Sequence, residues 1–184
     1  DTIAIGASGR NGGFMSSSLV HGIGNGMARF PEEVETLERL GLENLEEIKA
    51  TIRANGIDCD LSSPGAIETA MTPGQVEELS GGVEELKRFG HEAVFLDAEA
   101  MRAEVNSPTY LAAHWDRHST ALVHPARLAN ELACAARELG AEILEHSPVR
   151  RPESSGAGVD VVSDAGRGHS PPPALPTNAF PSLL

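Results

Sequence analysis

Residues 6–13 (GASGRNGG) combine a flexible backbone with side chains that can donate hydrogen bonds. Glycine lets a backbone approach a ligand closely, and successive N–H groups in such a turn form a concave site for anions. Arg10 adds a permanent positive charge with forked donors, and Ser8 and Asn11 add short polar side chains. The pattern fits a phosphate-bearing or otherwise electron-rich ligand. Glycine-rich loops are common, however, so the spacing alone favours a solvated terminal loop.

Two histidines could also suggest a metal site. His114 and His118 flank Asp116, but ligands four residues apart share a face only on a helix, and this stretch predicts a strand and a turn. No third ligand is evident in the sequence, so we expect no bound metal. Cys59 and Cys134 form no CxxC motif, and we expect two free thiols in a reducing compartment.

The composition narrows the class of protein. A chain of 184 residues is long enough for a domain with a core, and its net charge of −13 argues against a nucleic acid as partner. No apolar run is long enough to cross a bilayer, and no signal peptide is recognisable, so we expect a cytoplasmic protein without a membrane span. Because the first residue is Asp1, we also expect the natural start to lie upstream.

The elements that must position these residues follow from hydrophobic periodicity and from glycine and proline signals. Strands are predicted at residues 57–61, 65–71, 93–97, 109–116, 120–123, 141–149 and 158–163, and residues 3–5 are either the tail of a strand or a connection after one. Helices are predicted at residues 30–55, with a division at Gly41, at 72–89, directly after Asp97, and at 124–139. The prolines within 166–180 favour a loop or a sheet edge. This order of strands and helices indicates a mixed α/β fold.

Two helix starts carry strong local signals. Thr72, Pro73 and Gln75 form a capping-box pattern, and His124-Pro125 opens the clearest helix. The buried face of that helix is predicted to consist of Leu128, Leu132, Ala135, Ala136 and Leu139. The acidic run 32–49 could contact a partner, but a solvated amphipathic helix is the more common explanation.

The loop at 6–13 resembles the second flavin-contacting loop of the FAD-dependent oxidoreductases of the D-amino-acid oxidase and glycine oxidase superfamily. The subgroup that it resembles most is the γ-glutamylputrescine-oxidase-like amine oxidases. Further segments are similar to successive parts of that family, at residues 38–48, 56–70, 95–149 and 177–184. The resemblance therefore covers nearly the whole chain, apart from about 25 residues after Arg151.

The resemblance implies FAD as cofactor and a partial Rossmann-like FAD-binding domain with an inserted substrate domain of antiparallel strands and helices. It assigns residues 1–29 and 30–56 to the FAD-binding domain, 57–120 to the substrate domain, and 121–184 to the FAD-binding domain again. The family's GxGxxG motif is absent from the sequence, so the resemblance also implies an N-terminally truncated fragment. Residues implied to lie along the cofactor are Ser8, Arg10, Asn11, Gly12, Gly13, Val149, Thr177, Asn178 and Ala179.

The family's activity implies oxidation of the C–N bond of a small amine or amino acid to an imine, with the flavin performing the redox step. No catalytic residue is implied. Tyr110, His114 and Trp115 could line a substrate pocket, although a packing role is the more common one for such side chains. The alternative from another class is a non-catalytic acidic α/β module that binds no flavin and acts through protein contacts. The sequence leaves the substrate, the electron acceptor and the oligomeric state open.

Overall fold

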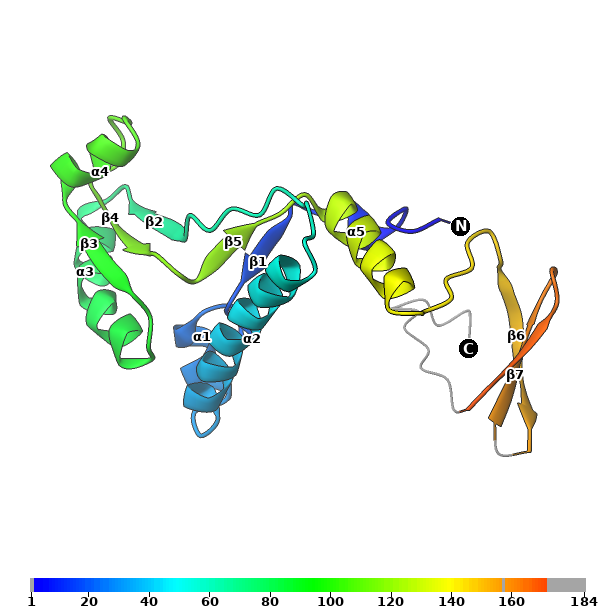
Figure 1. The fold of residues 1–184 in the computed structure, drawn as a ribbon. Helices are drawn as coiled ribbons and strands as arrows, with labels where there is room; N and C mark the ends of the chain where they lie inside the picture. Colours follow the sequence, from blue (N-terminus) through cyan, green and yellow to red (C-terminus); the bar gives the residue numbers. More distant parts are fainter. Residues whose placement is uncertain (1, 157, 172–184) are drawn as a thin grey trace.

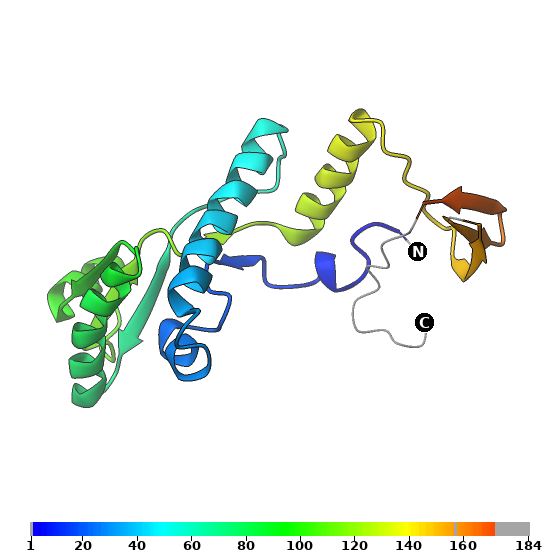
Figure 2. The ribbon, with the colours of Figure 1, turned by 90° about the horizontal axis from the view of Figure 1, so that it is seen from below.

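The computed structural model describes residues 2–156 and 158–171. The described residues form three small β-sheets with strand orders β1-β5, β2-β4-β3 and β6-β7-β8, and every described strand pair is antiparallel. Figures 1 and 2 show the β2-β4-β3 sheet at one end of the molecule, the β1-β5 pair with α2 in the middle, and the β6-β7-β8 sheet at the other end. The structure is thus a mixed α/β arrangement, as predicted.

The middle part joins two segments that lie far apart in the sequence. Strand β1 (Phe14–Ser16) pairs with β5 (Thr120–Leu122), and the ladder is extended by bonds from Ser17 N to Ser119 O (2.8 Å) and from Val123 N to Gly13 O (2.9 Å). Helix α1 (Ile23–Arg29) and the long helix α2 (Val34–Ala54) follow β1 in the chain. Consequently, β1, which directly follows the glycine-rich loop, is fixed by hydrogen bonds to β5.

The sheet of β2 (Ala66–Ala70), β4 (Ala112–Asp116) and β3 (Ala93–Leu96) has β4 at its centre. Helix α3 (Pro73–Arg88) packs on this sheet through a small core that contains Ala70, Leu79 and Ala112. The predicted capping box at its start is confirmed, because Thr72 accepts a bond from Gln75 N while the Gln75 side chain accepts from Thr72 N. Helix α4 (Ala98–Glu104) begins with the predicted Asp97 cap.

The remaining elements follow β5 directly. Helix α5 (Pro125–Glu138) starts at His124, as predicted, and the short 3-10 helix η1 (Ala7–Gly9) packs against it. A three-stranded antiparallel sheet then follows, made of β6 (Val149–Ser155), β7 (Gly158–Ser163) and β8 (Arg167–Ser170). Strand β8 lies where the sequence predicted a loop or a sheet edge.

Several predicted elements are wrong. Residues 57–61 and 141–148, all within the described part of the chain, form no strand, and residues 3–5 form a connection, the second of the two possibilities stated for them. Each of these stretches contains a non-glycine residue with positive φ, namely Ala4 (63°), Asp60 (54°) and His146 (54°), which is incompatible with a continuous extended strand. The chain is not divided at Gly41 either, since α2 runs through it without a break.

The predicted buried face of α5 is formed only in part in the described chain, since Leu128 packs against the core around Ile52 and Val123, and Ala135 and Ala136 are half-buried. Ala133 is the buried residue of this helix, whereas the side chains of Leu132 and Leu139 are exposed to 41% and 82%. The amphipathic pattern is present, but little of the described chain packs against its apolar side.

Among the described residues, no helix combines the length and the apolar character that a membrane crossing requires.

Candidate functional site

The glycine-rich loop is held in shape by the side chain of Asn11. Its Nδ2 donates to the carbonyl oxygens of Ala7 (3.0 Å) and Ser8 (3.1 Å), and its Oδ1 accepts a bond from Gly13 N (2.9 Å). The sequence pattern suggests Asn11 as a donor for a ligand. In the structure its amide group instead organises the turn, since short polar side chains readily bond to neighbouring backbone groups.

Other donors of the loop face outward. Within the described part of the chain, the backbone N–H groups of Asn11 and Gly12 have no hydrogen-bond partner, and Arg10 forms no ion pair. Ser8, Arg10, Asn11 and Gly12 are all exposed. Two free backbone donors, next in the chain to an exposed arginine, suit a phosphate or another electron-rich group. The residues present therefore fit the phosphate-bearing ligand predicted from the sequence.

Gly13 fixes this loop to the start of α5. It is buried and has a φ of +73°, and a Cβ atom there would lie 2.0 Å from the carbonyl oxygen of Val123. Any side chain would therefore collide with the backbone that leads into α5, and the positive φ would add strain. Glycine at this position is required by the close approach of the loop to the β5–α5 connection.

A mostly apolar cavity of about 430 Å³ lies between the loop and α5. Ser8, Asn11 and Gly13 contribute its polar side, and apolar side chains of β1, α2 and α5 contribute the rest, namely Phe14, Met15, Ile48, Val123, Pro125, Leu128, Ala129 and Leu132. Polar donors at one edge of an apolar groove are the usual arrangement of a cofactor or small-molecule site. The groove is therefore the candidate site in the described structure.

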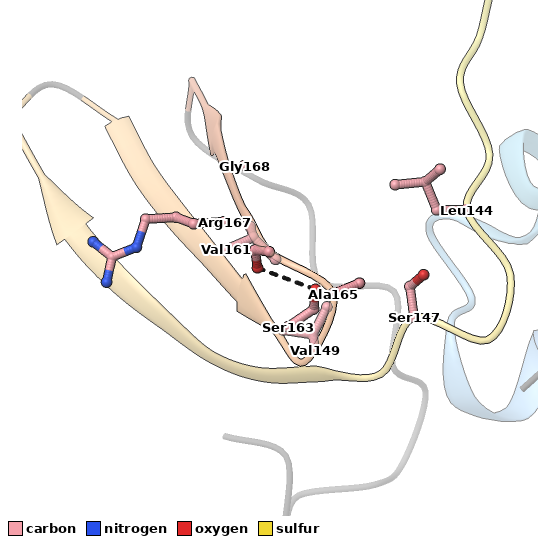
Figure 3. A pocket seen from close by; sticks show the side chains of 9 residues that line it. Leu144, Ser147, Val149, Val161, Ser163, Ala165, Arg167 and Gly168 are labelled. Atoms are coloured by element: carbon pink, nitrogen blue, oxygen red, sulfur yellow. Dashed lines mark hydrogen bonds between the residues drawn. The ribbon is translucent and has the colours of Figure 1, made fainter.

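Val149 lies elsewhere in the described structure. It lines a second cavity, of about 420 Å³, together with Leu144, Ser147 and residues of β7 and the β7–β8 turn (Figure 3). The turn is closed by bonds from the backbone N and the Oγ of Ser163 to Gly166 O, at 2.9 and 3.1 Å. A bond from Ile3 N to Glu145 Oε1 (2.8 Å) connects the segment before the loop to the segment before β6. The cofactor role of Val149 remains a prediction.

The other predicted cofactor residues, Thr177, Asn178 and Ala179, lie outside the described residues. Of the three candidate pocket residues, Trp115 donates from Nε1 to Pro64 O (2.9 Å) and lies under the guanidinium of Arg117, 4.2 Å from the ring centroid. Tyr110 is half-buried just before β4, and His114 lines a polar cavity between β1 and the β2-β4-β3 sheet. Trp115 thus has a structural role, and the use of His114 and Tyr110 in a pocket remains a prediction.

A buried group of charges that no sequence pattern indicates is formed by Glu38, His91 and Asp116, which we call the histidine cluster. His91 Nδ1 lies 2.6 Å from Asp116 Oδ2, and its Nε2 lies 3.2 Å from Glu38 Oε2. No sequence signal links the three, because they belong to α2, the α3–β3 connection and β4. Among the described residues, no three His, Cys, Asp or Glu side chains are arranged to share a metal ion.

Comparison with known proteins places the chain among flavin-dependent oxidoreductases. The family described as FAD dependent oxidoreductase (DAO) matches residues 1–174. The chain is 36% identical to gamma-glutamylputrescine oxidoreductase of Escherichia coli over 151 residues, which cover 80% of this chain and 34% of that protein. It is 28% identical over 185 residues to the probable oxidoreductase OrdL of Haemophilus influenzae, covering 99% of this chain and 42% of that protein.

The fold is shared with solved structures. The crystal structure of glycine oxidase from Geobacillus kaustophilus superposes with a TM-score of 0.71 at 19% identity, covering 90% of this chain and 44% of that chain. This likeness supports the fold alone. In each of these comparisons the chain spans less than half the length of the protein that it matches.

Proposed function

This chain belongs to the FAD dependent oxidoreductase (DAO) family, and from that premise we propose that it forms part of a flavoenzyme that oxidises the C–N bond of an amine or amino acid to an imine. The similarity to gamma-glutamylputrescine oxidoreductase supports an amine as substrate. We further propose that residues 1–56 and 121–184 belong to the FAD-binding domain and residues 57–120 to the substrate domain. Support for this division comes from the end of α2 at Ala54, after which the chain leads to β2 of another sheet.

The observation that carries the proposal is the free donor set of the loop at residues 6–13. The guanidinium of Arg10 and the N–H groups of Asn11 and Gly12 would hold the phosphate-bearing part of FAD, and Asn11 and Gly13 keep that turn in shape. FAD, when bound, supplies the two-electron acceptor for the amine. The task of the chain's own residues is to bind and orient the cofactor, and the adjoining apolar groove along α5 excludes water from one side of it.

The proposal is tested with protein expressed from the gene together with whatever coding sequence flanks these 184 residues. We expect a yellow protein with the absorption bands of oxidised flavin. We also expect it to become bleached when an amine from a panel of γ-glutamylputrescine, glycine, sarcosine and D-amino acids is added without oxygen. A colourless protein that cannot be reconstituted with FAD would contradict the proposal and would favour the non-catalytic acidic α/β module.

A pair of arginine variants separates the role of the loop from a general effect of charge. Arg10→Gln removes a charged donor at the proposed phosphate contact, and hydrogen bonds to charged groups contribute about 1.5–3 kcal/mol. The dissociation constant of FAD should therefore rise by roughly tenfold or more. The matched control Arg102→Gln removes an exposed charge on α4 and should leave that constant within about twofold. Equal effects of both variants would contradict the assignment of Arg10.

A further inference from the structure

The histidine cluster joins two parts of the chain that are otherwise connected by few contacts. Glu38 comes from α2, which lies beside the β1-β5 pair, whereas His91 precedes β3 and Asp116 ends β4 in the neighbouring sheet. All three residues are buried, with side-chain exposures of 1%, 4% and 6%. Glu38 and His91 are 53 residues apart, so this bond is a tertiary contact between α2 and the sheet.

With both acids ionised, the geometry favours the doubly protonated form of His91. Both of its ring nitrogens face a carboxylate oxygen, at 2.6 Å for Asp116 and 3.2 Å for Glu38. A neutral imidazole carries one N–H group, whereas the imidazolium carries two. Only the charged form can therefore donate to both carboxylates, and loss of a proton would leave a nitrogen lone pair directed at a carboxylate oxygen.

The two carboxylates have few hydrogen bonds other than those to His91, so they depend on its positive charge. Within the described chain, the second oxygens of both acids, Glu38 Oε1 and Asp116 Oδ1, are buried without a hydrogen-bond partner. Buried charges are tolerated only when they are paired and hydrogen-bonded. If the imidazole became neutral, two carboxylates would remain in a buried environment with a single N–H between them, and exposing them to water would relieve the repulsion.

Other ionisable groups face the same region. His114 on β4 and Glu68 on β2 line the same cavity of about 260 Å³ as the three cluster residues, and their side chains approach each other to 3.7 Å. Glu92, which follows His91, pairs with His118 at 3.0 Å on the surface. Of these four groups, Glu68, Glu92 and His118 are largely exposed and are screened by solvent, so the strongest electrostatic partners of His91 are Glu38 and Asp116.

The charges also influence each other's proton affinity in the direction that the geometry requires. The hydrogen bond to Asp116 raises the pKa of His91 above the ordinary value of histidine, and Glu38 acts in the same direction while burial opposes both. Burial would raise the pKa of Asp116, but the hydrogen bond and charge of His91 hold that pKa below its usual value. Each group therefore favours the charged form of the other.

Movement of α2 would be transmitted to the segment that follows the glycine-rich loop. A Cβ atom on Gly41 of α2 would lie 1.8 Å from Ser17 O, so the helix rests directly on the backbone after β1. Ser17 N in turn donates to Ser119 O in the β4–β5 turn. A shift of α2 at the cluster would therefore reach the backbone that directly follows β1.

We propose that Glu38, His91 and Asp116 form a proton-operated latch that holds α2 against the β2-β4-β3 sheet. The latch is closed while His91 carries both ring protons and opens when the imidazole loses one of them. It thereby sets the position of the sheet that carries His114 and Trp115 relative to the segment that follows the glycine-rich loop. This device lies outside the residues proposed to bind FAD, and its tests need no flavin.

The pH dependence has a defined sign. Because the folded pKa of His91 is raised, its contribution to stability is complete below the unfolded value of about 6.5 and is lost as pH rises through the folded pKa. Within that window, the folding equilibrium constant should fall by about tenfold per pH unit. Asp116 acts at acidic pH, since its contribution to stability is lost as pH falls through its lowered pKa.

Urea unfolding of the 184-residue chain at several pH values tests the linkage. His91→Gln should abolish the decline of stability above a pH of about 6.5, and the control His118→Gln, which alters an exposed histidine, should retain it. Where His91→Gln does not fold, Glu38→Gln is used instead. The midpoint of the His91 imidazole titration, followed by NMR, should then move toward lower pH. A wild-type stability that is flat across this window, or an unmoved midpoint in Glu38→Gln, would overturn the proposal.

Opening of the latch is measured as a change in the distance between α2 and α3. Spin labels are attached to Glu47→Cys on α2 and Glu77→Cys on α3, in a Cys134→Ser background, because Cys134 is exposed while Cys59 is buried. The expected label-to-label distance distribution is narrow below the pKa of His91 and broad or longer above it. The His91→Gln version should be broad at both pH values. A distribution that is unchanged while His91 titrates would show a buried ion cluster without a latch.

Discussion

Gly41 lies inside α2, where an alanine would ordinarily strengthen the helix. In an exposed helix interior, replacing glycine by alanine stabilises a protein by roughly 0.5–1 kcal/mol, because alanine loses less backbone freedom on folding. At Gly41, however, a Cβ atom would lie 1.8 Å from the carbonyl oxygen of Ser17, far inside the ordinary contact distance of 3.4 Å. The backbone of Ser17 is buried and bonded to Ser119 O at 2.8 Å, so it cannot yield easily.

The size of the effect follows from this geometry. To reach ordinary contact, α2 would have to move away by ~1.6 Å. Overpacking of this kind costs about 1–3 kcal/mol, and losing the buried bond of Ser17 would add about 1 kcal/mol. After the gain in helix propensity is subtracted, we expect Gly41→Ala to lower the free energy of unfolding by about 1–3 kcal/mol.

Gly81 provides the matched control. It lies in α3, is exposed, and has no heavy atom within 4 Å of the position that an alanine Cβ would take, so Gly81→Ala should raise the free energy of unfolding by roughly 0.5–1 kcal/mol. Both variants are compared by urea unfolding, followed by circular dichroism at the helix band. If Gly41→Ala is as stabilising as Gly81→Ala, the close contact between α2 and Ser17 does not exist, and the coupling of α2 to the loop segment loses its basis.

Three further predictions concern other parts of the chain. Thr72→Ala removes the capping box of α3 and should lower the free energy of unfolding by about 1 kcal/mol in the same urea assay; no change would mean that the cap is not formed in solution. Cys134 is exposed and should react with Ellman's reagent at once, whereas Cys59 is buried, which raises the pKa of its thiol, and should react only after denaturant is added; equal rates would contradict this burial. In calorimetric titration, the 184-residue chain alone should bind FAD weakly or not at all, since its sequence lacks the GxGxxG motif that provides the main pyrophosphate contacts in dinucleotide-binding folds; tight binding would refute this.

Helix starts could be predicted from the sequence because their determinants are local. Thr72 with Gln75, Asp97, and His124 with Pro125 each carry their capping groups within three residues, and all three helices begin where the pattern indicated. No distant partner is needed to satisfy the first N–H groups of a helix. The first residues of these helices could therefore be predicted correctly from the capping residues alone.

The strand predictions failed where the pattern was right but the backbone was not extended. At residues 57–61, Ile57 and Cys59 are buried while Asp58 and Asp60 are exposed, which is the alternation of a strand. The two aspartates pair with Arg127 of α5, and Asp60 adopts a positive φ of 54° that interrupts the strand. Alternation thus correctly predicted which side chains are buried, but pairing with another strand depends on partners that the local sequence does not contain.

The candidate site was predictable only in part for a similar reason. The glycine-rich loop could be found from composition, and its exposed donors fit the predicted type of ligand. The use of Asn11 to close the turn is local, since its partners lie two to four residues away, but several local arrangements are open to such a side chain. The need for glycine at position 13 depends on Val123 O, which lies 110 residues away in the chain. Sequence spacing therefore located the loop, but it did not predict which loop residues hold the turn in shape and which remain free to bind a ligand.

Glu38 shows most clearly why a buried charge escapes prediction from sequence. It belongs to the acidic run 32–49, whose other glutamates are exposed as the solvated-helix interpretation predicted, yet Glu38 is 1% exposed. Its spacing from Val34 and Leu45 places it on the buried face of α2, but what makes its burial tolerable is His91, 53 residues away, which the local sequence does not reveal. A buried carboxylate without that partner would destabilise the fold by several kcal/mol, so the burial of Glu38 and the protonation of His91 depend on each other. Neutralising His91 would leave Glu38 buried without its partner, whereas neutralising Glu38 would leave His91 paired with Asp116 and lower the pKa of the imidazole.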